Sequence, residues 1–172
     1  MTPDLQRLHQ CFDQLSAIVD SLDLELVDDP QWIEPSDTSY LNDSDQADPD
    51  IMANVEAMAA TNKLIAWFGR DHEGFVGLWR GAEDQPLDRA PVVRLDSEGQ
   101  YNIVAATIPD YLAISMPEEE FESSRQVLVA AGFKVTASDT EIWEALNDAE
   151  SPNDFRYALY NEERVRRGLP QI

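Results

Sequence analysis

The chain has 172 residues, with 34 Asp or Glu against 12 Lys or Arg, so its formal net charge is −22. This length favours one domain spanning residues 1–172, and the single cysteine excludes a disulfide within the chain. The negative charge repels phosphate groups, so we expect neither nucleic acid nor an anionic membrane as a partner. It favours a basic protein partner, although solubility alone also accounts for an acidic surface.

Motifs for catalysis and for membrane insertion are missing from the sequence. No apolar run reaches the about 18 residues of a membrane span, and residues 1–10 are polar, unlike a signal peptide. The sequence contains no glycine-rich phosphate loop, no G-x-S-x-G nucleophile motif and no H-E-x-x-H zinc motif. We therefore expect a cytoplasmic protein that is not an enzyme and carries no cofactor.

The first 50 residues divide into an amphipathic part and an acidic part. An apolar residue recurs every three or four positions over residues 3–22, which predicts one helix that packs onto a sheet. Residues 24–27 form a short candidate strand. Residues 28–50 are acidic and irregular and contain three prolines. A stretch of this length in a compact domain is typical of a mobile or partner-binding segment.

Within the acidic stretch, the spacing of Asp43, Asp45 and Asp48 resembles a calcium loop. An EF-hand loop that starts at Asp43 needs Gly where Asp48 stands and Glu where Asn54 stands. Both are absent, so we expect no metal site. Asp48 is instead suited to cap a helix that begins at Pro49. The expected buried face of this helix consists of Ile51, Val55 and Met58.

Four apolar runs joined by polar turns predict an antiparallel meander, with strands at residues 64–68, 75–79, 92–95 and 101–105. Trp67 and Trp79 are expected to be mostly buried in its central hairpin. Because successive strand residues face opposite sides, both faces of the sheet are apolar. We expect helices to cover one face, and the acidic stretch or a partner to cover the other.

The remainder of the chain predicts helices. A short helix is expected at residues 107–112 and a longer one from Pro117 to Gly132, with Val127 and Leu128 among its buried residues. A capping box at residues 138–141 opens a further helix. A last helix begins at Pro152, and the arginines near its end suit the helix dipole. The expected fold is therefore α+β, with a central antiparallel sheet of about four to six strands surrounded by helices.

The turn between the first two strands holds the triplet Asp71, His72 and Glu73. Two carboxylates and a histidine can perform acid–base chemistry or bind a metal, which would make the protein a small hydrolase. An ordinary polar hairpin turn accounts for the same triplet and is the interpretation that we favour. The sequence leaves both interpretations open.

Four segments in a fixed order carry a family resemblance. They read L-I-A-W-F-G at 64–69, G-F-V-G-L-W at 74–79, P-V-V-R-L-D-S-E-G at 91–99 and I-P-D-Y-L at 108–112. This order resembles the SUKH superfamily, which joins fungal cell-wall regulators to bacterial immunity proteins. The resemblance implies an α+β fold and a protein that binds a toxin domain, often a basic nuclease, without catalysis. The same resemblance is also compatible with an adaptor or regulatory domain that binds a host protein.

The negative charge of the chain and its resemblance to the SUKH superfamily together favour a basic protein partner, whose surface is covered by acidic residues of this chain. Residues 8–62 contain 13 Asp or Glu and no Lys or Arg. We expect contacts from the 28–50 stretch and from the 71–73 turn, with an aromatic residue as anchor. The candidate partner-binding residues are Trp32, Tyr40, Asp43, Asp45, Asp48, Asp71 and Glu73.

Overall fold

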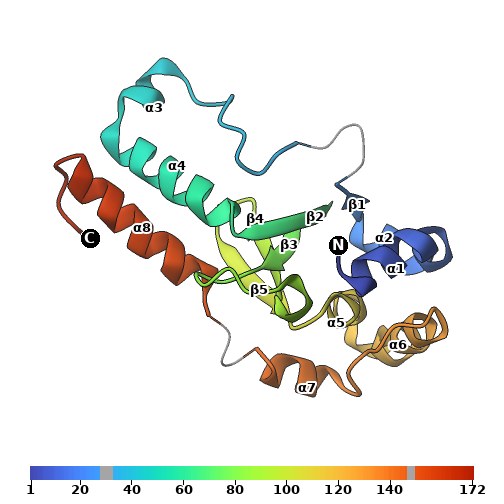
Figure 1. Cartoon of the computed structure of the whole chain (residues 1–172). Helices are drawn as coiled ribbons and strands as arrows, with labels where there is room; N and C mark the ends of the chain where they lie inside the picture. Colours follow the sequence, from blue (N-terminus) through green and yellow to red (C-terminus); the bar gives the residue numbers. More distant parts are fainter. Residues whose placement is uncertain (28–32, 147–149) are drawn as a thin grey trace.

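A computed structural model describes residues 1–27, 33–146 and 150–172 (Figure 1). It confirms the expected α+β fold with a central antiparallel sheet. The strands are β1 (Glu25–Leu26), β2 (Ile65–Asp71), β3 (Gly74–Trp79), β4 (Val92–Asp96) and β5 (Tyr101–Ala105). Their order in the sheet is β1-β2-β3-β4-β5, so each strand pairs with its neighbours in sequence. None of the helices in these ranges is long and apolar enough to cross a membrane.

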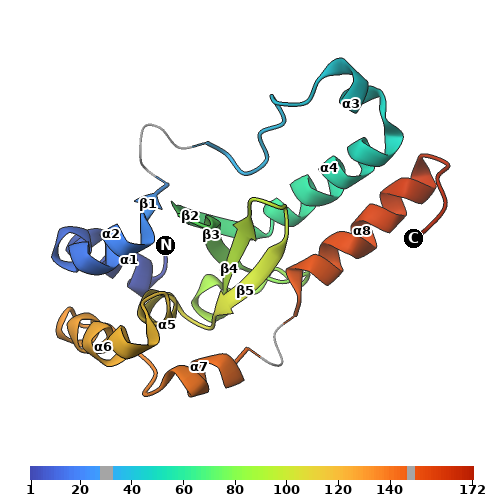
Figure 2. The same ribbon diagram turned by 180° about the vertical axis from the view of Figure 1, so that it is seen from behind.

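Helices from the N-terminal part of the chain and from the segment after β5 cover one face of the sheet (Figures 1 and 2). They are α1 (Pro3–Cys11), the 3-10 helix η1 (Phe12–Leu15), α2 (Ser16–Leu22), α5 (Ile108–Ile114) and α6 (Phe121–Ala130). The larger hydrophobic core lies here, where Leu8 and Tyr111 pack with Phe68 and Val76 of the strands. The single helix expected over residues 3–22 is wrong, because the chain tightens into η1 between two shorter helices.

Two long helices cover the opposite face. α4 (Pro49–Asn62) and α8 (Pro152–Arg166) lie side by side and run antiparallel in both views (Figures 1 and 2). Met58 of α4 and Phe155 of α8 pack onto a smaller core that includes Ile65, Trp79 and Tyr101. The expectation that the acidic stretch or a partner covers this face is therefore wrong.

The two strand tryptophans occupy this smaller core with different partners. Trp79 is 1% exposed and its ring lies 5.6 Å from that of Phe155. Trp67 is half-buried and meets Phe75 edge-on at 6.2 Å. Trp67 is opposite Gly77 across the hairpin, where an added Cβ would lie 2.9 Å from the indole. A glycine at this position therefore leaves room for the indole.

The acidic stretch contains more regular structure than expected. A short helix, α3 (Asp43–Ala47), begins at a capping box, in which the Asn42 side chain accepts from the N–H groups of Ser44 (2.8 Å) and Asp45 (3.1 Å). Asp48 then caps α4 by accepting from the N–H group of Asp50 (2.8 Å). The acidic residues whose spacing resembles a calcium loop thus belong to two successive helix starts, capped by Asn42 and Asp48. Trp32 lies outside the described residues.

The remaining elements are α7 (Asp139–Glu144) and the short 3-10 helices η2 (Leu87–Arg89) and η3 (Glu118–Glu120). Two expected helix faces are right only in part. On α4, Met58 packs onto the smaller core as expected, but Ile51 is exposed and the fully buried residues include Ala53 and Ala57. α6 buries Leu128 as expected, but Val127 is exposed. Residues 133–136 form neither helix nor strand and link α6 to α7.

Candidate functional site

Asp71 at the end of β2 is the centre of a buried polar network. Its side chain is 0% exposed. Its Oδ2 atom accepts from Nε (3.0 Å) and Nη2 (2.6 Å) of Arg94 and from the hydroxyl of Tyr111 (2.7 Å). Its Oδ1 atom accepts from the N–H groups of Glu73 and Gly74, each at 2.9 Å. Asp71 therefore joins the β2–β3 turn to β4 and α5, and the expectation that it contacts a partner at the surface is wrong.

The protonation states of this network follow from its burial. Burial, and then the negative charge of Asp71, raise the pKa of Tyr111 above the ordinary tyrosine value. Burial acts to lower the pKa of Arg94, but the hydrogen bonds and charge of Asp71 outweigh it, so that pKa is raised. At neutral pH the network is thus an ion pair with a neutral tyrosine as an additional donor.

The other two members of the triplet lie at the surface with separate partners. Nδ1 of His72 lies 2.9 Å from the carbonyl oxygen of Leu22, and Glu73 forms an ion pair with Arg94. Across residues 1–27, 33–146 and 150–172, no group of three or more His, Cys, Asp or Glu could hold a metal ion. Asp71 and Glu73 therefore share Arg94, one from the buried side and one from the surface, whereas His72 contacts the carbonyl oxygen of Leu22.

The other expected partner residues lie on what we call the acidic arm, residues 33–48. Every charged residue in this segment is Asp or Glu, and Tyr40 is 75% exposed. Asp43 and Asp48 are exposed, while Asp45 is half-buried beside its capping partner. The arm leads into the N-terminal end of α4, and the 71–73 turn follows β2 beyond the C-terminal end of α4 (Figure 1). The start of the arm does return to the C-terminal end of α4, where Ser36 accepts from Nδ2 of Asn62 (2.9 Å), but Tyr40 and α3 lie by the N-terminal end of this helix.

Tyr40 contributes to a groove of about 670 Å³ between the arm, α4, α8 and the β4–β5 turn. We call it the tyrosine groove. Its defining residues are Tyr40, Ile51, Glu98, Tyr157 and Tyr160. Three of these, Tyr40, Ile51 and Tyr157, leave more than a third of their surface exposed. Exposed tyrosines with an apolar neighbour are typical of the anchors in protein interfaces.

Polar contacts between α4 and α8 form the floor of the tyrosine groove. The Asp50 carboxylate accepts from the Tyr160 hydroxyl (2.7 Å) and pairs with Arg164, and these contacts lower the pKa of Asp50. Arg156 donates to Oδ1 of Asn54 (2.6 Å), and its guanidinium lies 4.3 Å from the centre of the Tyr157 ring. These contacts fix the tyrosine rings in place.

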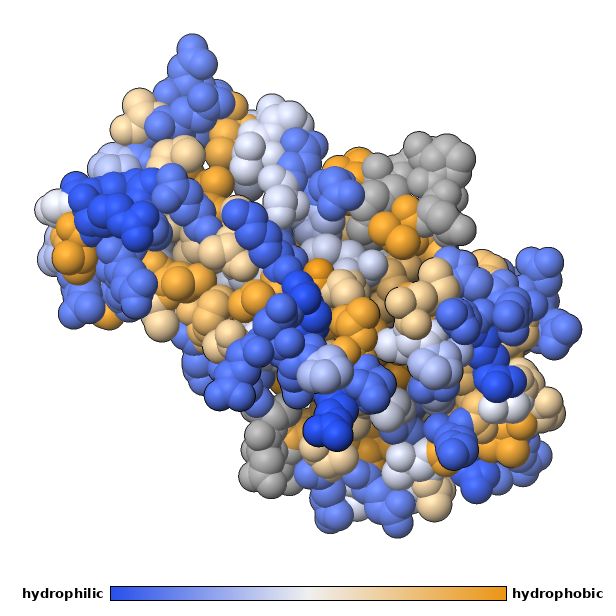
Figure 3. Space-filling view, viewed as in Figure 1, coloured by the Kyte–Doolittle hydropathy of each residue, from blue (hydrophilic) through white to orange (hydrophobic). Residues whose placement is uncertain are grey.

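Internal ion pairs leave the surface strongly acidic. Arginines pair with carboxylates of the same chain, for example Arg70 with Glu25 at 2.6 Å and Arg167 with Glu56 at 2.6 Å. The excess carboxylates stay in solvent because the chain has 34 acidic and only 12 basic residues. Hydrophilic residues are spread over much of the face shown in Figure 3, with apolar residues between them.

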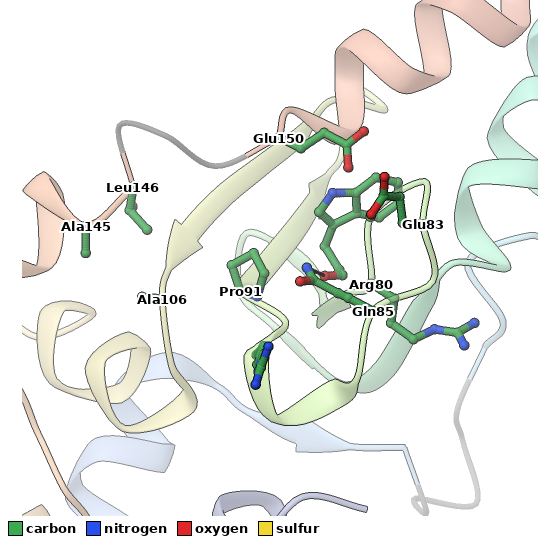
Figure 4. A pocket seen from close by; sticks show the side chains of 11 residues that line it. Arg80, Glu83, Gln85, Pro91, Ala106, Ala145, Leu146 and Glu150 are labelled. Carbon is green, nitrogen blue, oxygen red and sulfur yellow. Dashed lines mark hydrogen bonds between the residues drawn. The ribbon is translucent and has the colours of Figure 1, made fainter.

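A separate pocket of about 550 Å³ lies between the β3–β4 loop and the segment before α8 (Figure 4). Glu83 and Glu150 line it, while the Arg80 side chain extends away from them and donates to the carbonyl oxygen of Lys63 (2.7 Å). Oε2 of Glu150 accepts from the N–H group of Ala82 (3.1 Å), so this carboxylate holds the β3–β4 loop.

Sequence reasoning missed two features of these surfaces. The groove residues Tyr157 and Tyr160 belong to a helix more than 100 positions from Tyr40, and only the antiparallel packing of α4 and α8 brings them near it. Trp143 on α7 is 55% exposed. The acidic residues Glu141 and Glu144 beside it in the sequence could have indicated that Trp143 is exposed. Comparison with known proteins adds no relative, since no family model, curated protein or solved structure matches the chain.

Proposed function

We propose that this protein is a non-catalytic binding module that recognises a basic protein through the acidic arm and the tyrosine groove. The observation that carries the proposal is Tyr40, which is 75% exposed on a segment whose charged residues are all acidic. Tyrosine is enriched among the residues that dominate binding energy, and acidic neighbours attract a basic surface. A lysine or arginine of the partner can also bind the face of a tyrosine ring.

The resemblance to the SUKH superfamily narrows the proposal. It supports an immunity protein that neutralises a toxin domain by covering its active surface. A net charge of −22 suits this role, because basic nucleases carry a positive surface that binds phosphate. An adaptor that binds a basic host protein would use the same surface. A hydrolase built on Asp71, His72 and Glu73 has less support, since Asp71 is buried and fully hydrogen-bonded.

The test begins with capture of binding proteins from the source cell on the immobilised full chain. Each captured protein is then purified and its affinity is measured for wild type and for Y40A and Y157A. We expect a basic protein whose affinity falls at least about tenfold for each variant. V127A removes an exposed side chain on α6, far from the groove in sequence, and serves as the matched control. Captured proteins that are acidic, or that bind both tyrosine variants as they bind wild type, would contradict the proposal.

A further inference from the structure

We infer that a second surface, centred on Trp143, binds an extended basic peptide segment. This inference rests on the proposed protein-binding function but uses none of the residues of the tyrosine groove. Trp143 is 55% exposed, although tryptophan is a large apolar side chain that is normally well buried. The neighbouring Ile142 is 1% exposed and anchors α7, so the helix presents Trp143 from a fixed position.

Two adjoining hollows lie against the Trp143 side chain. One has a volume of about 220 Å³ and is lined by Glu73, Arg94 and Val104 among others. The other has a volume of about 190 Å³ and is lined by Met116, Phe121 and two acidic residues. Both hollows also include Ile114 and Trp143, which therefore form the boundary between them. We call this surface the Trp143 ledge.

The size of the hollows favours a peptide over a small molecule. Each is smaller than the roughly 300–1,000 Å³ of typical small-molecule sites. Two small hollows side by side instead suit two side chains of one extended chain. In such a chain, alternate residues point the same way and lie roughly 6.6 Å apart. Apolar side chains at these positions can contact Ile114, Met116 and Phe121.

The charges around the ledge select a basic peptide. Glu73 lines one hollow, and Glu118 and Asp139 line the other. The arginine among the lining residues, Arg94, is already paired with Asp71 and Glu73. The ledge therefore has a negative net charge, and the face of an exposed indole is the best aromatic acceptor for a cation. A basic peptide is attracted both by the negative charge and by the indole face, whereas an acidic peptide is repelled.

The experiment uses a phage-displayed library of random dodecapeptides, selected on the folded full chain. Enriched peptides are then titrated against wild type, W143A, the charge reversal E118K and Y40A. We expect basic peptides with alternating apolar residues, whose affinity falls at least about tenfold for W143A and also falls for E118K. Y40A should bind them as wild type does. Because Trp143 and Glu118 are exposed, unfolding curves of both variants should match wild type.

Three results would overturn the inference. They are the absence of any enriched peptide, enrichment of acidic peptides, and peptides that bind W143A and E118K as tightly as wild type. Peptides that lose affinity for Y40A alone would support the tyrosine groove and refute the Trp143 ledge. If peptides lose affinity for W143A while captured proteins bind Y40A and Y157A as tightly as wild type, the tyrosine groove is refuted instead. The two proposals therefore fail separately.

Discussion

At the scale of single residues, Asp71 shows how one carboxylate can organise a turn, a strand and a helix. It accepts five hydrogen bonds, from Arg94, Tyr111 and two backbone N–H groups. From the sequence, Asp71 was a residue of a polar turn, a candidate for acid–base chemistry and a candidate partner contact, but not a core residue. Arg94 and Tyr111 lie 23 and 40 positions away, and no local pattern connects them to it. The burial of Asp71, and hence its structural role, could not be predicted.

Substitution of Asp71 should be among the most destabilising changes in the chain. D71N leaves Arg94, whose side chain is 14% exposed, without its buried counter-charge. We expect the free energy of unfolding, measured with urea, to fall by about 3–5 kcal/mol. E73Q is the matched control, because Glu73 pairs with the same arginine but is 54% exposed, and it should cost about 1 kcal/mol or less. Similar losses for both variants would contradict the assigned role of Asp71.

Tyr111 should make the protein sensitive to alkali. Y111F removes a donor to a buried carboxylate and should cost about 1.5–3 kcal/mol near neutral pH. Because the folded-state pKa of Tyr111 is raised, its contribution is fully present below the ordinary value of about 10 and is lost as pH rises above it. Stability should therefore fall less steeply above about pH 10 in Y111F than in wild type.

Urea unfolding at several pH values measures this difference. Y111F should still lose some stability at alkaline pH, because burial also raises the pKa of Tyr101. Y157F alters an exposed tyrosine and should follow wild type throughout. Identical alkaline slopes for wild type and Y111F would refute the argument.

At the scale of elements, local signals were predictable and long-range packing was not. Asp48 and Ser138 cap their helices as the sequence indicates, because a cap depends on residues two or three positions apart. The face that α4 buries depends on α8, which follows about 90 residues later. The arginines near the end of α8 suit the helix dipole, and two of them also pair with acidic residues of α4, Arg164 with Asp50 and Arg167 with Glu56. Charge order within one helix does not reveal such a partner.

The ion pairs between α4 and α8 should make this pair of helices sensitive to acid. The hydrogen bond from Tyr160, together with Arg164, lowers the folded-state pKa of Asp50. Because the pKa of Asp50 is lowered on folding, its ionised carboxylate stabilises the protein at pH values above the ordinary aspartate pKa of about 3.9. This contribution is lost as the pH falls through the folded-state pKa. D50N should therefore melt below wild type at neutral pH and lose less stability below about pH 4.

Thermal melting of D50N across the acid range tests this expectation. D43N removes an exposed carboxylate from α3 and serves as the control for the loss of one negative charge. If D43N and D50N shift the melting temperature equally at every pH, the Asp50–Arg164 contact does not stabilise the helix pair.

At the scale of the whole molecule, charge and aromatic exposure point to recognition of a basic protein. Composition predicted the sign of the surface, because the net charge of −22 must lie mostly in solvent. It could not predict where aromatic anchors meet that charge. Tyr40 was an expected anchor, whereas Tyr157 and Trp143 became candidates only through their exposure in the folded chain. The two ends of the molecule thus offer separate acidic surfaces with aromatic residues.

The rate of association with the captured basic partner, measured by stopped flow at low and high salt, tests the central claim most directly. The variant D43N/D45N/D48N removes three negative charges from the acidic arm. It keeps the helix caps, since asparagine caps as well as aspartate. We expect the wild-type rate to fall at least about tenfold from low to high salt. The variant should bind more slowly than wild type at low salt and equally fast at high salt. An association rate that neither salt nor the triple substitution changes would contradict recognition through the acidic arm.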